Sequence, residues 1–309
     1  MSRVSLWPRR PRQFLSVFAL CAGIGVSGAS IFSSHELCEG FVPENDLKIP
    51  VGMITGGGIT ATEFNDVLDR IEKLYKDEIT QHGGTLEINR AWEDETVNAS
   101  AQQIGNSWIL NMYGGLARHA TINVEGFALV ACHEMGHHLG GAPKIRGWYG
   151  NQWATNEGGA DYYATLKCLR RFFAEDDNAA IIANSEIDPY ADTICRSQYA
   201  DREDQLICLR NSLAAMSVGR LFKELRNEDN DPRFDTPDTS VVQRTNDRHP
   251  ATQCRVDTYF NGATCDVSVD SPLSNTDYKS GSCYKEKYSV GWRPRCWFKP
   301  TEPKTTALF

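Results

Sequence analysis

The feature that most constrains this chain is the pattern HExxH, which begins at His133. Residues four apart lie on one face of a helix, so His133 and His137 can present two imidazoles to one metal ion. Glu134 follows one step round the helix, where a general base is needed beside an open coordination position. An apolar lead-in from Gly126 and the glycine pair at 140–141 predict the two ends of this helix. The pattern therefore predicts a buried helix that carries a catalytic zinc site.

A third protein ligand is needed, because catalytic zinc sites use three protein ligands and keep one position for water. The metzincin pattern would place a histidine at position 143, which is Pro143 here. A second helix is predicted over residues 153–173, with Thr155 as its N-cap. We expect Glu157 to be the third ligand, and Asp161, on the same face, to accept a hydrogen bond from the outer nitrogen of a ligand histidine. The alternative is a solvated helix start, where the helix dipole favours acidic residues.

The N-terminal segment 1–30 indicates a secretory signal peptide. Its four arginines precede an apolar run, and Ser27-Gly28-Ala29 supplies small residues for cleavage. The alternative is an uncleaved N-terminal anchor, for which the run is short. Loss of the segment would change the formal charge of -8 to about -12. So acidic a chain is not expected to bind nucleic acid, and no later stretch favours stable membrane insertion. We therefore expect an exported protein, either periplasmic or extracellular.

The ten cysteines are typical of an exported chain rather than a cytosolic one. Cys21 would leave with the signal peptide, so an odd number remains and one cysteine is expected to be free. We expect this to be Cys132, buried beside the metal ligands; the alternative is that Cys38 is a latency thiol that blocks the metal. The other cysteines are predicted to form disulfides, with their connectivity open. Short loops favour the pairs Cys195–Cys208, Cys254–Cys265 and Cys283–Cys296.

The remaining hydrophobic periodicity predicts an α+β chain that is mostly helical with a small sheet. We expect helices over 61–80 and 206–225, strands over 85–92 and 107–113, and mostly loop over 176–204 and 226–248. Thr60 and Glu63 form a capping box before the first of these helices. The cysteine-rich region 254–309 shows little helical pattern. The strand before the zinc helix is expected to offer an edge that binds an extended peptide by strand addition.

Several of these motifs together resemble the gluzincin peptidases of the CAAX prenyl protease and HtpX type. They are HExxH, the ExxAD segment from Glu157 to Asp161, an HPxxxxR element from His249 to Arg255, and a VNA segment that ends at Ala99. The resemblance extends over about residues 60–256.

The resemblance implies a zincin-like metallopeptidase domain over 31–256, with a disulfide-rich C-terminal extension over 257–309 that the family pattern does not include. Many members of the family are embedded in membranes, and this sequence has no helices of that kind. The resemblance also implies zinc at His133, His137 and Glu157, a catalytic Glu134, and His249 and Arg255 near the site. These are expectations that the structure must meet.

The expected reaction is zinc-dependent hydrolysis of peptide bonds in a protein or peptide substrate, with an endopeptidase favoured over an exopeptidase. Glu134 would take a proton from the attacking water and pass it to the leaving amine. His249 is the first candidate for a second donor to the oxyanion and Arg255 the next. The alternative for His249 is a turn histidine fixed by the proline after it. The alternative function is a zinc-holding, chaperone-like or peptide-binding protein with little turnover, but Glu134 favours the enzyme.

Two further predictions concern the surroundings of the zinc helix. His138 lies about 100° round the helix from His137, so we expect it behind the ligands or at the surface. Trp148, Tyr149 and Trp153 lie between the two predicted zinc helices and are interpreted either as a substrate pocket or as core. The oligomeric state is not predicted.

Overall fold

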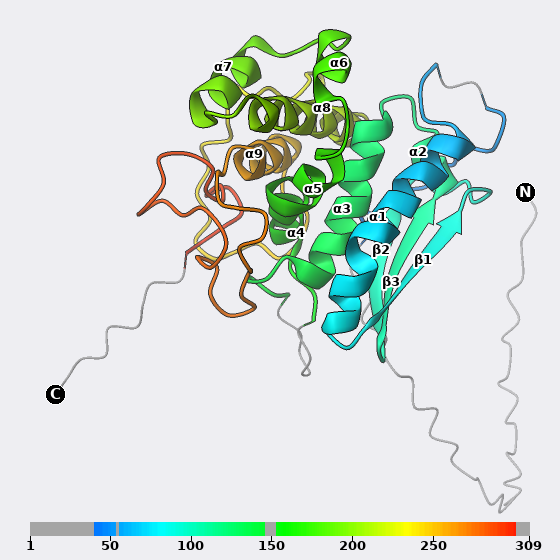
Figure 1. The fold of residues 1–309 in the computed structure, drawn as a ribbon. Coiled ribbons are helices and arrows are strands. Elements are labelled where there is room, and N and C mark those ends of the chain that lie inside the picture. Colours follow the sequence, from blue (N-terminus) through cyan, green and yellow to red (C-terminus); the bar gives the residue numbers. More distant parts are fainter. Residues whose placement is uncertain (1–39, 54–55, 146–152, 301–309) are drawn as a thin grey trace, which may run out of the picture. The chain divides into compact units, whose positions relative to one another are not determined.

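The computed structural model describes residues 40–53, 56–145 and 153–300 (Figure 1). The predicted signal peptide 1–30 and the residues Cys38, Trp148 and Tyr149 lie outside these ranges. All of the described residues belong to one structural unit. Within them, no helix combines the length and the apolar character needed to cross a membrane.

The described part of the chain is α+β, with many helices and one small sheet. The helices are α1 (Ala61–Gln81), α2 (Gly114–Ala117), α3 (Val124–Leu139), α4 (Glu157–Tyr163), α5 (Leu169–Phe173), α6 (Asn178–Ala183), α7 (Pro189–Gln198), α8 (Arg202–Leu225) and α9 (Thr252–Ala263), and the strands are β1 (Thr85–Ala91), β2 (Ala99–Ile104) and β3 (Ser107–Tyr113). A π-helical turn, Ala164–Cys168, joins α4 to α5.

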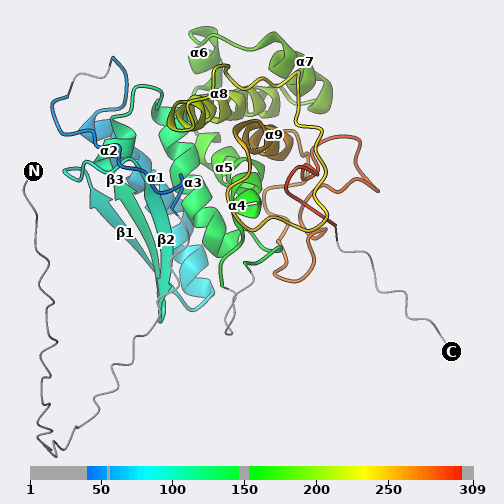
Figure 2. The same ribbon diagram turned by 180° about the vertical axis from the view of Figure 1, so that it is seen from behind.

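The sheet has the strand order β1-β3-β2, with β1 parallel and β2 antiparallel to β3. Figures 1 and 2 show α1 and α3 on the same face of the sheet. The predicted strands β1 and β3 are confirmed, whereas the periodicity does not predict β2. Its sequence ASAQQI has few strong strand formers, so pairing with β3 rather than propensity holds it in the sheet. The strand before the HExxH helix, β3, is central and paired on both sides, so the expectation that it offers an edge for strand addition is wrong; the outer strands are β1 and β2.

Helix α1 forms where the sequence predicts it, behind the predicted capping box. The Thr60 hydroxyl accepts from the Glu63 amide at 3.2 Å, and the Glu63 carboxylate accepts from the Thr60 amide at 2.8 Å. Its buried stripe faces the core and consists of Phe64, Val67, Leu68, Ile71, Tyr75 and Ile79. Helical periodicity and local capping together are sufficient to place this element.

Three predictions for the C-terminal half are wrong. The region 176–204 is not mostly loop, because α6 and α7 lie there behind the caps Asp177 and Asp188. Helix α8 begins at Arg202 rather than 206, since Asp201 accepts hydrogen bonds from its first turn. The cysteine-rich region also begins with a regular helix, α9.

The structure contains four disulfides among the described residues, and only Cys195–Cys208 matches a predicted pair. The others are Cys132–Cys168, Cys254–Cys296 and Cys265–Cys283. The prediction of a free Cys132 is therefore wrong, and its disulfide ties α3 to the π-helical turn.

The predicted pairs Cys254–Cys265 and Cys283–Cys296 fail because of α9. Cys254 lies near the start of this helix and Cys265 just beyond its end. Eleven residues of helix span roughly 16 Å, whereas the Cα atoms of a disulfide are about 4–7 Å apart. Each end of α9 is therefore joined to the C-terminal segment instead.

Candidate metal centre

Helix α3 presents His133, Glu134 and His137 from its buried C-terminal half. Asn123 caps its N-terminus by accepting from the Gly126 amide at 2.8 Å, and the helix ends at Gly140. The three site residues have 0% of their surface exposed. The predicted helix and its C-terminal end are confirmed; the helix begins at Val124, two residues before the predicted lead-in.

Helix α4 carries Glu157 as its first residue, so it begins four residues later than predicted. Asn156, not Thr155, is the N-cap; its side-chain oxygen accepts from the Gly159 amide at 3.0 Å. The two helices that carry the candidate ligands touch where α3 has a glycine: a Cβ at Gly136 would lie 2.9 Å from the Ala160 Cα. This close contact brings Glu157 up to the two histidines.

The distances between the three side chains fit a zinc ion. His133 Nε2 lies 3.3 Å from one Glu157 oxygen, and His137 Nε2 lies 3.6 Å from the other. Ligands that surround zinc tetrahedrally at 2.0–2.1 Å are separated by about 3.3 Å. Among the described residues, neither Nε2 atom has a hydrogen-bond partner. Buried, unpaired nitrogens beside a carboxylate form a donor set that zinc prefers.

The outer nitrogen of each histidine is held by a neighbour. His133 Nδ1 lies 2.7 Å from an Asp161 oxygen, and His137 Nδ1 lies 2.8 Å from the Thr155 carbonyl oxygen. Such contacts fix the tautomer of a ligand histidine and direct its other nitrogen towards the metal. The structure therefore places Asp161 where the sequence predicts it, and gives Thr155 a part that the sequence does not predict.

Asp161 is itself fixed by two residues of α9. Arg255 donates from Nε and Nη2 to the two carboxylate oxygens, each at 2.8 Å, and the Tyr259 hydroxyl donates at 2.5 Å. Burial alone would raise the pKa of Asp161, but Arg255 and His133 outweigh it and lower that pKa to about 2. Asp161 is therefore held as a carboxylate.

Arg255 lies behind Asp161 rather than facing the metal cluster. Its remaining donor, Nη1, bonds to the Phe41 carbonyl oxygen at 2.7 Å. The guanidinium lies 4.8 Å from the Phe41 ring and 4.1 Å from the Phe222 ring. The guanidinium N–H groups that we expected to donate to an oxyanion therefore donate to Asp161 and Phe41 instead. These contacts fit a residue that orients Asp161.

His249, in contrast, reaches the cluster. Its Nε2 lies 3.2 Å from a Glu157 oxygen and 2.7 Å from the Gly40 carbonyl oxygen. The side chain is only 6% exposed. A turn histidine fixed only by the next proline would not be expected to enter the site in this way.

Glu134 lies beside the ligands without belonging to them. Its Oε2 atom lies 4.0 Å from His137 Nε2. Within the described ranges, neither carboxylate oxygen has a hydrogen-bond partner. Burial raises the pKa of Glu134 to about 8, although His133 lowers it in part. A carboxyl group so placed can exchange a proton near neutral pH.

His138 is part of the core and not of the surface. It stacks against Trp108 and Trp153, at ring-centroid distances of 5.2 and 4.9 Å, and His82 also stacks on Trp108. Burial lowers the pKa of His138 to about 3, so the ring is neutral. Trp153 therefore packs against this histidine, which supports its interpretation as core.

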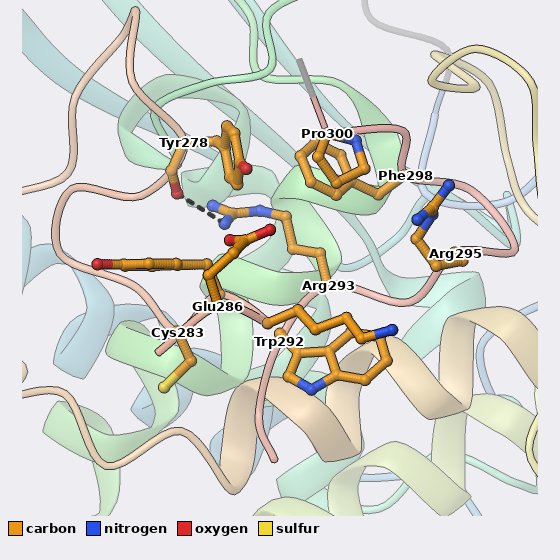
Figure 3. A pocket seen from close by; sticks show the side chains of 10 residues that line it. Tyr278, Cys283, Glu286, Trp292, Arg293, Arg295, Phe298 and Pro300 are labelled. Atoms are coloured by element: carbon orange, nitrogen blue, oxygen red, sulfur yellow. Dashed lines mark hydrogen bonds between the residues drawn. The ribbon is translucent and has the colours of Figure 1, made fainter. Parts of the chain in front are cut away.

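Two other places could suggest a site. Asp238, Cys254 and Cys296 lie close together, but the two cysteines are joined in a disulfide and offer no thiolates. A pocket in the C-terminal segment is lined by aromatic and basic side chains (Figure 3), including Trp292 and Arg293. Its volume for water-sized groups is about 50 Å³, well below that of small-molecule sites. No predicted site residue lines it.

No protein-family model matches the sequence, and neither the curated proteins nor the solved structures include a match.

Proposed function

We propose that this protein is a zinc metallopeptidase that hydrolyses peptide bonds. One observation carries the proposal: His133, His137 and Glu157 converge, and an independent contact holds the outer nitrogen of each histidine. A purely structural cluster would not need the buried carboxylate of Glu134 beside it, which has no hydrogen-bond partner in the described part of the chain. The resemblance to gluzincin peptidases supports the same proposal, with a zincin-like fold.

The ligands would be His133, His137 and Glu157, and zinc would polarise the substrate carbonyl and acidify the attacking water. Glu134 would accept a proton from that water and deliver it to the leaving amine. His249 would donate from its ring to the developing oxyanion, since it is placed beside Glu157. Arg255 would position Asp161, which orients His133.

The disulfides fit an oxidising compartment. We propose that residues 1–30 direct export to the periplasm or the extracellular space. A protein or peptide is the proposed substrate, and cleavage within the chain is favoured over cleavage at its ends.

The second candidate function is a zinc-holding protein that binds extended or misfolded chains with little turnover. The burial of the site favours it, because the three ligand side chains are at most 1% exposed. A site that never opened would hold zinc and hydrolyse nothing.

The test is cleavage of casein and of a degenerate peptide pool by the zinc-loaded protein, followed by mass spectrometry. Glu134→Gln keeps the shape of the side chain but cannot act as a base. We expect it to retain one zinc ion per chain and to lose cleavage by about 10³-fold or more. A chelator should abolish cleavage by the wild type. Undiminished cleavage by Glu134→Gln would refute the mechanism, and full zinc content without any cleavage would favour the binding protein.

A further inference from the structure

The described residues before α1, from Gly40 onwards, pair with the outer edge of β2 and with the residues that precede β2. The Phe41 amide donates to the carbonyl oxygen of Ala99, the first residue of β2, at 2.8 Å. The Asn98 side chain bonds to both the amide and the carbonyl oxygen of Val42, at 3.1 and 3.2 Å. A single side-chain amide thus binds the backbone of this segment as a neighbouring strand would.

The pairing continues in an antiparallel direction. Lys48 and Thr96 form an isolated antiparallel bridge, and the Ile49 amide donates to the Glu95 carbonyl oxygen at 2.9 Å. In Figure 2 the segment, drawn in blue, passes the end of the sheet next to α3. Backbone pairing at a free strand edge is the means by which many proteins bind extended peptides.

The same segment reaches the metal cluster. The Gly40 carbonyl oxygen accepts from His249 Nε2, which also lies 3.2 Å from Glu157. The Phe41 ring packs edge-on against the His133 ring at 5.0 Å and is fully buried. Gly40 and Phe41 therefore lie between the edge of β2 and the cluster, where an extended substrate would have to pass.

We infer that the segment Gly40–Val42 competes with the substrate. The segment occupies the place of the substrate until a substrate chain displaces it. The inference rests on the proposed function. A peptide that bound by strand addition would need the Ala99 carbonyl oxygen and the side-chain amide of Asn98. Both groups already bond to Phe41 and Val42. A covalently attached competitor has a high effective concentration, so even weak pairing keeps most substrates out.

The contacts of the segment also indicate which substrates could replace it. Arg255 Nη1 is buried and donates to the Phe41 carbonyl oxygen, so a replacing chain must supply a carbonyl there. The Phe41 side chain lies between His133 and Phe222, which favours a large apolar residue at this position. A Cβ at Gly40 would lie 2.8 Å from the Ala99 oxygen, so a small residue should precede it. The favoured substrate is an extended chain with a small residue followed by a large apolar one.

Gly40→Ala tests the inference, because the added methyl group would meet both the end of the Asn98 side chain and the backbone carbonyl oxygen of Ala99. Its Cβ would lie 2.6 Å from the Asn98 Oδ1 and 2.8 Å from the Ala99 oxygen. The segment must therefore separate from β2. We expect kcat/KM for a quenched fluorescent peptide to rise about tenfold, as the loss of one or two hydrogen bonds predicts. Val51→Ala is the matched control: it lies in the same segment, is 49% exposed, and should leave kcat/KM unchanged.

A second readout does not depend on cleavage. Zinc loss to an excess of chelator should be about tenfold faster in Gly40→Ala than in the wild type, because the segment covers the cluster. Asn98→Ala loses both bonds to Val42 and should behave in the same way in this assay, even if Gly40→Ala does not fold.

Unchanged or slower zinc loss in both variants would overturn the inference, as would a fall in kcat/KM for a folded Gly40→Ala protein. If neither wild type nor variant cleaves any peptide while both bind zinc, the proposed function fails. The rate of zinc loss then still shows whether the segment covers the cluster.

Discussion

At the scale of single residues, the site depends on how firmly Asp161 is held. Its carboxylate contacts His133 on one side and accepts from Arg255 and Tyr259 on the other. All four side chains are buried, so water cannot replace a lost donor. In the proposed zinc site, Arg255 and Tyr259 would therefore help to set the strength of His133 as a ligand, although they act on it only through Asp161.

Tyr259→Phe removes one of these donors without changing the shape of the side chain. We expect the zinc affinity to fall about tenfold, the lower end of the range for partners of ligand histidines. Competition with a chromogenic chelator measures it. Tyr190→Phe, at a tyrosine that is 43% exposed, is the control and should keep wild-type affinity. Equal affinities for all three proteins would show that the Tyr259 hydroxyl does not support the ligand.

At the scale of helices and strands, the parts that could be predicted are those whose causes are local. Helix α1 has apolar periodicity, α3 is an apolar run that contains HExxH, and each has its own N-cap. The strand β2 and the helix α9 could not be predicted, since tertiary pairing holds one and disulfides anchor the other. The contacts of Phe41 and Tyr259 with the site join residues more than ninety positions apart. Only a three-dimensional structure could show them.

Helix α9 also carries a pH dependence that is separate from the metal cluster. Burial raises the pKa of Asp257 from 3.8 to about 6, while the Asp238 amide and the Gln253 side chain lower it in part. The folded protein therefore binds more protons than the unfolded chain between about pH 4 and 6. The contribution of Asp257 to stability is greatest below pH 4 and is lost as the pH rises through that range.

We expect Asp257→Asn to remove this contribution. The free energy of unfolding of the wild type, minus that of the variant, should fall by roughly 2 kcal/mol from pH 4 to 7. Urea unfolding at several pH values measures both proteins, and the subtraction removes the titration of the metal cluster. A difference that is independent of pH, or that rises with pH, would contradict the assignment.

At the scale of the whole molecule, the C-terminal segment braces the start of helix α4, which carries the candidate ligand Glu157. Trp297 is fully buried against Gly158, where a Cβ would lie 2.3 Å from the indole. The carbonyl oxygen of Trp297 accepts from the Asn246 amide. The Asn156 side chain, which caps α4, donates to the Asn246 carbonyl oxygen at 3.2 Å. The Cys254–Cys296 disulfide fixes this arrangement to α9, next to Arg255. The geometry at Glu157 therefore depends on residues at the far end of the chain.

Replacing Cys254 and Cys296 together by alanine should weaken zinc binding as well as folding. Loss of this cross-link is expected to cost about 4 kcal/mol of stability, and the loosened brace about tenfold in zinc affinity. The matched control removes Cys195 and Cys208, which join α7 to α8. That variant should lose about 3 kcal/mol and keep its zinc affinity, because its closed loop is shorter and neither helix carries a ligand. Urea unfolding and chelator competition separate the two effects. Equal loss of zinc affinity in both variants would mean that general stability, and not the brace, governs the metal centre.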